Sequence, residues 1–235
     1  VSRINEAGLN VNQYGNRNLI INGAMTVAQR GTSAVTATAN FPVDRFRVEH
    51  STDGAFTGQQ STDVPSGEGF THSIKYQTTT ADASLAASQY FYTRQIIEGL
   101  NSAHLMFGSS SAKTVTLSFW VKSSLTGTFG GSVWNDGFNR SHPYSYTISA
   151  ANTWEKKTIT ITGDTSGTWL TTNGRGLNIA WGLGLGSDYS GTAGAWAGSG
   201  LISATGATSL IGTLDATWYI TGVQLEVGDT ATDFE

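Results

Sequence analysis

The sequence predicts an all-β protein, an antiparallel β-sandwich, and three observations lead to this fold class. The 235 residues include 29 glycines, 7 tryptophans and only 3 prolines, and they are rich in Ser and Thr. Thr and the aromatic residues favour strands, whereas Gly supplies turns and disfavours helix. Several segments alternate apolar and polar residues with a period of two, which is typical of strands with one buried face. No long segment has helical periodicity. Sandwiches of roughly 200–250 residues commonly form one domain.

Composition also excludes several classes of protein. The chain has no cysteine, so disulfides and thiolate metal sites are absent. Charged residues make up 13% of the chain and the net charge is −4, so the basic footprint of a nucleic-acid-binding protein is missing. No apolar run approaches the ~20 residues of a membrane helix. We therefore expect neither nucleic acid as a partner nor membrane insertion. Because residue 1 is Val and no signal peptide opens the chain, we expect a processed or excised segment.

The first 17 residues contain too few apolar side chains for a core of their own. We predict that residues 1–17 are an extended N-terminal arm or the end of a shaft, and that residues 18–235 are one domain. A turn is expected at Asn22-Gly23. The clearest strand lies at 114–122, where Val, Leu, Phe and Val at odd positions alternate with hydroxyl residues. Trp120 is the exception, because it is a large aromatic residue on the polar face of this strand.

Other strands are expected at 70–80, 88–99, 153–163, 176–187 and in the closing segment. In that last segment Val223, Leu225 and Val227 alternate, and Gly222 interrupts the phase as a β-bulge would. One or two helical turns are allowed at 80–88. Four long Gly/Ser/Asn-rich segments are predicted to be loops: 51–69, 123–146, 163–176 and 186–213.

Four segments together carry a family resemblance: "NLIINGAM" (18–25), "KTVTLSFWVKSS" (113–124), "ANTWEKKTITITGD" (151–164) and "TWYITGVQLEVGDTATDFE" (217–235). Their succession resembles the jelly-roll domains of carbohydrate-binding modules related to the galactose-binding-like fold. It is more closely similar to a domain of bacteriophage virion proteins, chiefly tail-fibre proteins, which share "DRF" at 44–46 as well. The resemblance covers residues 17–235. It implies a jelly roll, a homotrimer with the arm leading out of a shaft, a place on the virion, and other fibre or tail proteins as partners.

The chain departs from the carbohydrate-binding modules at one place. Those modules often carry an acidic residue just before the closing "V-x-L" strand, where this chain has Thr221 and Gly222. The resemblance therefore does not by itself imply a calcium or saccharide site in this chain. Asp44-Arg45 belongs to the shared motif, and we interpret it as structural because an arginine can bind a carboxylate through two hydrogen bonds.

Catalytic and metal-site motifs are missing. The four histidines at 50, 72, 104 and 142 have no ligand spacing. The "GLGLGS" segment at 182–187 has no following helix with which to bind phosphate. A pair of carboxylates for glycoside hydrolysis would have to come from the aspartates at 136, 164, 188 and 215, which lie in turn-like sequences where Asp bonds its own backbone. We predict no catalytic residue, no metal and no cofactor, so the protein is not expected to be an enzyme.

Binding is the better hypothesis, and segment 130–146 is its main candidate. Saccharide recognition uses a flat aromatic face together with amides, carboxylates and guanidinium groups. This segment offers both kinds of group, and the candidate glycan contacts are Trp134, Asn135, Asp136, Phe138, Arg140, His142 and Tyr144. Exposed aromatics also mark protein interfaces, so anchoring of a long loop or a subunit contact is the alternative.

Secondary candidates lie elsewhere. Tyr189 and Trp196 stand in the segment 187–200, whose small residues suit close packing against another chain. Trp120 either lines a concave groove or lies under a neighbouring loop. The closing "GDTATDFE" is interpreted as scaffold, with Gly228 turning the chain out of the sheet and the tail leading onward.

Three functions remain open. The first is a non-enzymatic structural domain of a phage fibre or tail protein, located on the virion, that takes part in host attachment or binds a surface glycan. The second is a carbohydrate-binding module of a secreted enzyme or adhesin. The third, a glycan-cleaving enzyme, has least support in the residues.

Overall fold

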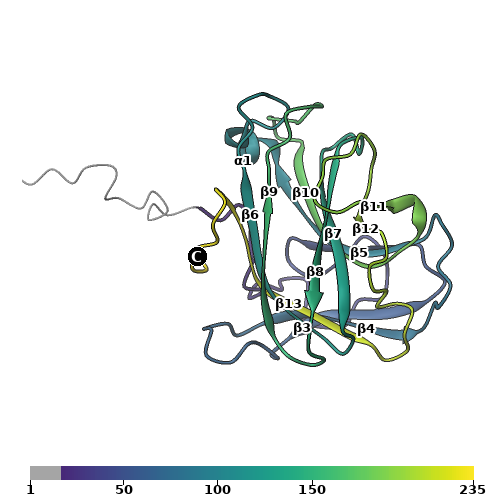
Figure 1. Cartoon of the computed structure of the whole chain (residues 1–235). Helices are drawn as coiled ribbons and strands as arrows, with labels where there is room; N and C mark the ends of the chain where they lie inside the picture. The colour runs from purple at the N-terminus through teal and green to yellow at the C-terminus, as the bar shows by residue number, and fades with distance from the viewer. Residues whose placement is uncertain (1–16) are drawn as a thin grey trace, which may run out of the picture.

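The computed structural model describes residues 17–235, which form an antiparallel β-sandwich with the jelly-roll fold that the sequence predicts (Figure 1). The six-stranded sheet has the order β1 (Asn40–Val43), β2 (Phe46–His50), β5 (Tyr90–Glu98), β10 (Arg175–Leu185), β7 (Gly127–Trp134) and β8 (Ser141–Ile148). The five-stranded sheet has the order β3 (Ala55–Ser61), β4 (Ser73–Thr80), β13 (Thr217–Val227), β6 (Val115–Ser123) and β9 (Glu155–Ile161).

The remaining elements are short. They are α1 (Gly99–Ser102), the 3₁₀ helices η3 (Ala103–Leu105) and η4 (Ser187–Tyr189), and a parallel pair formed by β11 (Ser190–Gly191) and β12 (Ser203–Ala204). None of the helices between residues 17 and 235 has the length and apolar character needed to cross a membrane.

The core lies between the two sheets and is built from the predicted alternation. Val115, Leu117, Phe119 and Val121 of β6 are fully buried, as is Trp181 of β10. Burying each such side chain contributes roughly 1.5–3 kcal/mol. The rings of Phe119 and Trp181 meet edge to face across the two sheets, with centroids 5.8 Å apart. Because successive residues of a strand face opposite sides, the even-numbered residues of β6 lie on the outer face of the five-stranded sheet.

The predicted bulge in the closing strand is confirmed. The register of β13 against β6 shifts between Thr221 and Gln224, and Gly222 has a φ of 60°. This left-handed conformation favours glycine because it has no Cβ. Val223 and Leu225 beyond the bulge are fully buried and complete the core as expected.

Two loop predictions and one helix prediction are wrong. Segment 51–69 contains β3, and segment 123–146 is mainly the hairpin β7–β8. Glycines weaken the strand signal of β7, yet Gly131 is needed there, since a Cβ at this position would clash with the ring of Tyr144. No helix forms at 80–88. The helical turns instead follow β5, at 99–105.

The C-terminal tail packs against the domain as far as Glu235, and the expectation that it leads onward stays a prediction. Gln224 and Glu226 are polar side chains on the outer face of β13, and both are buried. The Thr232 backbone N–H donates to Glu226 Oε1 (2.8 Å), and Gln224 Nε2 donates to the carbonyl of Asp233 (3.3 Å). The Arg17 N–H donates to Glu235 Oε2 (3.0 Å), so the tail ends beside residue 17 (Figure 1). The predicted arm, apart from Arg17, lies outside the described residues.

Candidate functional site

Four of the seven main candidates are buried. Trp134, Asn135, His142 and Tyr144 are each 3% exposed or less. The Tyr144 hydroxyl donates to the carbonyl of Ala180 (2.8 Å), and burial raises the pKa of this phenol well above its usual range. The expectation that these four side chains contact a glycan is therefore corrected, because the fold surrounds them with protein.

Asn135 instead organises the turn of the β7–β8 hairpin. Its Oδ1 accepts hydrogen bonds from the backbone N–H groups of Asn139 and Arg140, both at 3.1 Å. Its Nδ2 donates to the carbonyl of Thr168 (3.0 Å), which ties the turn to a neighbouring loop. Asn is favoured in turns because its side chain replaces such backbone bonds.

The charged candidates are bound within the chain. Asp136 pairs with Arg175 (2.5 Å) at the surface. Arg140 pairs with buried Asp164, and the hydrogen bond to this carboxylate raises the pKa of the guanidinium. Neither charge is presented alone to a ligand. Asp44-Arg45 forms no such ion pair among residues 17–235 and occupies the β1–β2 turn, where Arg45 has a φ of 75°.

Phe138 and Tyr189 are half-buried and lie on the outer face of the six-stranded sheet. Their ring centroids are 6.4 Å apart, and Phe138 also meets the Trp134 ring edge to face at 5.7 Å. Ile202 packs into this cluster from the segment that follows β11. The segment 187–204 thus covers its own sheet.

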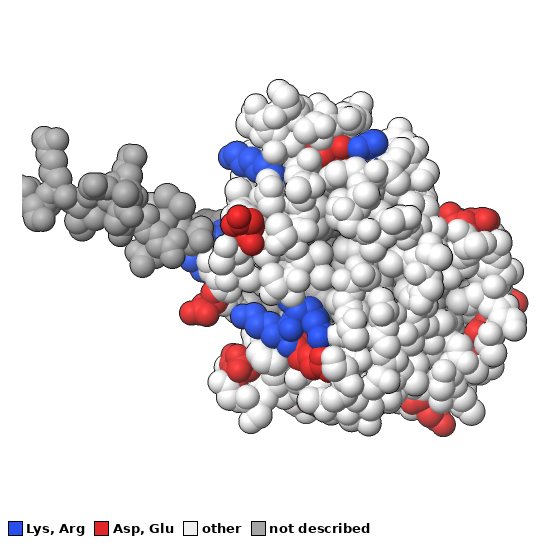
Figure 2. Space-filling view, viewed as in Figure 1, with Lys and Arg blue, Asp and Glu red and all other residues white. Residues whose placement is uncertain are grey.

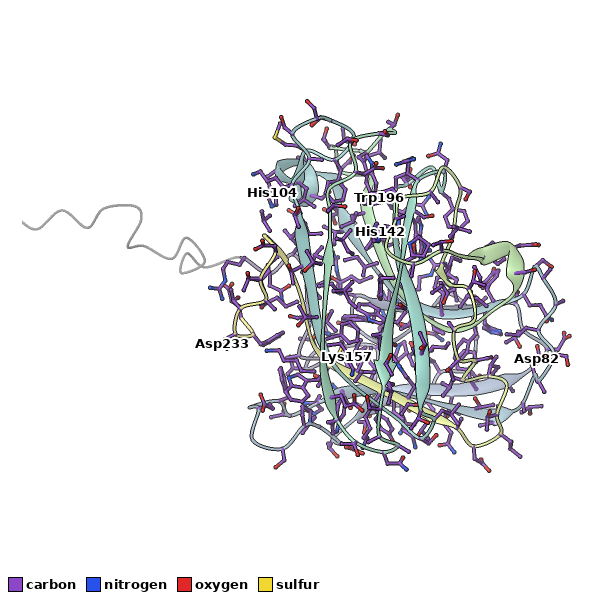
Figure 3. The ribbon with its side chains drawn as sticks, viewed as in Figure 1. Asp82, His104, His142, Lys157, Trp196 and Asp233 are labelled. Carbon is purple, nitrogen blue, oxygen red and sulfur yellow. The ribbon has the colours of Figure 1, made fainter. Side chains whose placement is uncertain are left out.

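Trp196 belongs to the same covering segment. Its ring contacts His142 at 5.1 Å, and its Nε1 donates to the carbonyl of Thr162 (2.7 Å). Figure 3 shows the two labelled rings close together on the ribbon. The Trp196 ring therefore packs on this chain itself, whereas several of the small residues around it, such as Gly194 and Gly198, are exposed, and their packing against another chain stays a prediction.

Trp120 has a different environment. It is half-exposed on the outer face of the five-stranded sheet, opposite Lys156 of β9 and Thr221 of β13. It lines a groove of about 450 Å³ together with Phe70 and Phe234. Of the two alternatives for Trp120, the groove is the one that the structure contains.

The groove wall beside Trp120 is formed by two further aromatic rings. Phe70 from the β3–β4 loop and Phe234 from the tail meet edge to face, with centroids 5.1 Å apart. Gly222 makes room for this pair, because a Cβ there would lie 2.5 Å from the Phe70 ring. The bulge in β13 and the folded tail thus position two of the three rings.

Polar groups surround the rings. The charged residues Glu68, Asp233 and Lys156 and the hydroxyl residues Ser118 and Thr232 complete the lining. Lys156 makes no ion pair with any residue between 17 and 235. The groove can therefore accept a molecule with an apolar face and several hydroxyl groups.

A row of charged and aromatic side chains crosses the same face next to the groove. The ammonium of Lys122 lies over the rings of Tyr219 (4.5 Å) and Trp154 (5.4 Å) and pairs with Asp63. Burial alone would raise the pKa of Asp63, but hydrogen bonds from Lys122 and Trp154 outweigh it and hold the pKa below its usual value. Figure 2 shows that in this view most of the surface is uncharged, with several of its Lys and Arg side chains next to Asp or Glu.

The described residues contain no cluster of metal-binding side chains beside the groove. Between residues 17 and 235 no three His, Asp or Glu side chains are grouped closely enough to hold a metal ion. Figure 3 shows the labelled histidines 104 and 142 well apart, with Asp233 distant from both.

Sequence reasoning missed Phe70 and Phe234. Phe70 stands in a Gly-rich loop without periodicity. Phe234 belongs to the closing motif, whose sequence indicates only scaffold. The signal that points to it is structural, since the tail that carries Phe234 is held on the outer face of β13 by hydrogen bonds to Gln224 and Glu226.

Comparison with known proteins supports the fold. No protein-family model and no curated protein matches the sequence. Among solved structures, the enzymatically active domain of tailspike protein 4 from bacteriophage CBA120 matches with a TM-score of 0.51 and 14% identity, over 90% of this chain and 22% of that chain. This chain thus spans about a fifth of the length of that tailspike.

Carbohydrate-binding modules match less closely. TmCBM61 in complex with β-1,4-galactotriose has a TM-score of 0.44 at 12% identity, over 90% of this chain and 99% of that chain. A family 11 module of a cellulosomal cellulase from Clostridium thermocellum has a TM-score of 0.41 at 11% identity, over 84% and 96%. At these identities the likeness to the tailspike establishes a shared fold and nothing further.

Proposed function

We propose that this domain binds a carbohydrate in the groove lined by Phe70, Trp120 and Phe234, without chemical conversion. The observation that carries the proposal is that three aromatic residues line one groove together with acidic, basic and hydroxyl residues. A sugar ring offers an apolar face to aromatic side chains and hydroxyls to such polar groups. The volume of about 450 Å³ lies within the range of roughly 300–1,000 Å³ that small-molecule sites occupy.

The charges of the groove favour an uncharged saccharide. Glu68 and Asp233 contribute two negative charges against one positive charge from Lys156. A hydroxyl both donates and accepts hydrogen bonds, so a neutral sugar satisfies both kinds of group. An anionic sugar would meet the two carboxylates and be disfavoured.

The test is a glycan array followed by calorimetric titration with the best neutral oligosaccharide. Trp120→Ala is expected to weaken binding at least tenfold while the fold is retained, because Trp120 lies outside the core cluster. The matched control is Tyr189→Ala, which removes a half-buried aromatic ring from the outer face of the other sheet. A loss of affinity in Tyr189→Ala but not in Trp120→Ala would overturn the assignment of the groove.

We further propose that the domain belongs to a phage fibre or tail protein located on the virion, where it serves attachment to a host surface glycan. The support is the succession of framework motifs from residue 18 to the closing "ATDFE". A homotrimer with other virion proteins as partners belongs to this proposal. Multi-angle light scattering tests the trimer. A molar mass that stays that of a monomer as the protein concentration is raised would contradict it.

The alternative is a carbohydrate-binding module of a secreted enzyme or adhesin. It predicts the same groove in a monomer. Mass spectrometry of purified particles separates the two, because only a virion protein is found there in stoichiometric amount.

A further inference from the structure

A second pocket lies on the opposite side of the sandwich, on the outer face of the six-stranded sheet. It has a volume of about 200 Å³, and its lining consists of Phe41, Arg45, Arg47, Arg94, Ile96 and Glu98. The residues come from β1, β2, β5 and the β1–β2 turn. Three arginines in one small pocket are unexpected in a chain whose net charge is −4.

Two of these arginines are held side by side. Arg47 and Arg94 are direct partners across β2 and β5, a placement that is unfavourable for like charges. A single oxygen, Oε1 of Glu49, lies 2.9 Å from Arg47 Nε and 2.7 Å from Arg94 Nη2. One carboxylate thus balances two guanidinium groups, and a positive charge remains.

The guanidinium groups have donor capacity left. Arg94 is 9% exposed, and its Nη1 donates to Asn178 Oδ1 (3.1 Å), but its Nε has no hydrogen-bond partner. The Arg45 side chain forms no ion pair with any of the described residues and is exposed at the pocket mouth. Arg30 adds a fourth guanidinium, 4.5 Å from the Phe41 ring centroid.

The backbone of Arg45 belongs to the two-residue turn that joins β1 and β2. Its φ of 75° lies in the left-handed region, which is unfavourable for a residue with a long side chain. Hairpin turns of two residues use positive φ values, so the turn accounts for this conformation. A glycine would adopt this φ without strain, but the chain has an arginine here, and its side chain lines the pocket.

We propose that this arginine pocket binds an oxyanion, a carboxylate or a phosphate group, carried on a sugar. Guanidinium groups match both oxyanions through paired hydrogen bonds. The apolar walls from Phe41 and Ile96 lie against the body of the ligand. Glu98 at the rim and Glu49 beneath the arginines are the acidic groups facing the pocket, and three arginines outnumber them. This proposal does not rest on the Trp120 groove, which belongs to the other sheet.

Calorimetric titration of the purified domain with glucuronate, glucose 6-phosphate and glucose tests the proposal. At least one of the two anionic sugars is expected to bind and glucose to bind at least tenfold more weakly; comparison of the two anions identifies the oxyanion. Binding is expected to weaken as salt is raised, because screening reduces the attraction. Glucose binding as tightly as both anionic sugars, or no binding of any of them, would overturn the proposal.

Variants locate the site. Arg45→Gly removes the guanidinium and supplies the residue best suited to a φ of 75°, so the fold is retained. It is expected to weaken binding about tenfold, as loss of one charge-assisted hydrogen bond predicts. Lys113→Ala removes an exposed positive charge elsewhere and is expected to change nothing. Equal losses of affinity in Arg45→Gly and Lys113→Ala would show a general effect of charge and would contradict the assignment of the site. Trp120→Ala is expected to leave this binding intact, which separates it from the proposed neutral-sugar site.

Discussion

The guanidinium of Arg140 binds the carboxylate of Asp164 through two hydrogen bonds, from Nε to Oδ2 at 2.8 Å and from Nη2 to Oδ1 at 2.6 Å. Asp164 is 1% exposed and also accepts bonds from the Ser166 backbone and the Trp169 indole. This pair joins the β7–β8 hairpin to the loop after β9. Arg140 therefore stabilises the fold, although its sequence context favours ligand contact.

Arg140→Ala is expected to lower the free energy of unfolding by about 3 kcal/mol, because it leaves a buried carboxylate without its counter-charge. Urea denaturation measures the effect. The matched control is Arg175→Ala, whose Asp136 pair is at the surface with 53% and 32% of the side chains exposed. Surface pairs contribute about 0–1 kcal/mol, so the control is expected to lose less than that. Similar losses in both variants would contradict the structural role of Arg140.

His142 makes stability depend on pH. Burial lowers the pKa of this imidazole from its ordinary value of 6.5, because charging it inside the protein is unfavourable. The neutral form is favoured in the folded state, so its contribution is complete above pH 6.5 and is lost as pH falls toward the lowered pKa. We expect the melting temperature to fall below pH 6.5.

Thermal unfolding between pH 8 and pH 4.5 checks this expectation. His142→Phe keeps a ring against Trp196 and is expected to reduce the pH dependence. The substitution is not expected to abolish the pH dependence, because burial also lowers the pKa values of His50 and His104. His72→Gln, on the loop before β4, is the control. A profile of His142→Phe that is identical to the wild type would refute the assignment.

The sequence predicts the elements whose pattern is local. Val115 to Val121 alternate without interruption, and this pattern alone indicates a strand with one buried face. The β7 strand is not predicted in this way, because Gly130 and Gly131 have no side chains and so do not show the alternation. Their necessity is tertiary, since β12 and Tyr144 occupy the space that Cβ atoms would need.

Exposure of the aromatic residues could not be predicted in the same way. Trp120 and Trp134 both stand on the outer faces of strands. Ile202 covers Trp134 from more than 60 residues away in the sequence, whereas Trp120 faces a groove. The sequence around each tryptophan does not show which distant segment covers it or leaves it open. For this reason sequence reasoning favours segment 130–146 over Trp120 as the binding site.

Gly222→Ala tests the bulge that shapes the groove. An alanine at φ 60° is strained, and its Cβ would displace the Phe70 ring. We expect a loss of about 2 kcal/mol in the free energy of unfolding, together with weaker saccharide binding in the Trp120 groove. Gly194→Ala is the control, because Gly194 has a φ of 87° but no atom within 4 Å of the position that an alanine methyl group would take. It is expected to cost about 1 kcal/mol from backbone strain alone and to leave binding unchanged.

One hydroxyl group takes part in two of the hydrogen bonds that hold the folded tail. Thr232 Oγ1 accepts a hydrogen bond from Gln224 Nε2 (3.2 Å) and donates one to Glu226 Oε2 (2.8 Å). Thr232→Val keeps the shape but leaves both buried polar groups with one bond fewer, so we expect a loss of about 1–2 kcal/mol. Phe234 is then held less firmly, and carboxypeptidase is expected to release the terminal residues faster.

The control for this prediction is Thr230→Val, two residues away. The Thr230 hydroxyl is exposed and bonds only to Asp229 Oδ1 (3.1 Å) among the described residues. Its removal is expected to change stability by less than about 0.5 kcal/mol and to leave the rate of carboxypeptidase release unchanged. Equal rates for the two variants would mean that the Thr232 hydroxyl does not help to hold the tail and would contradict this prediction.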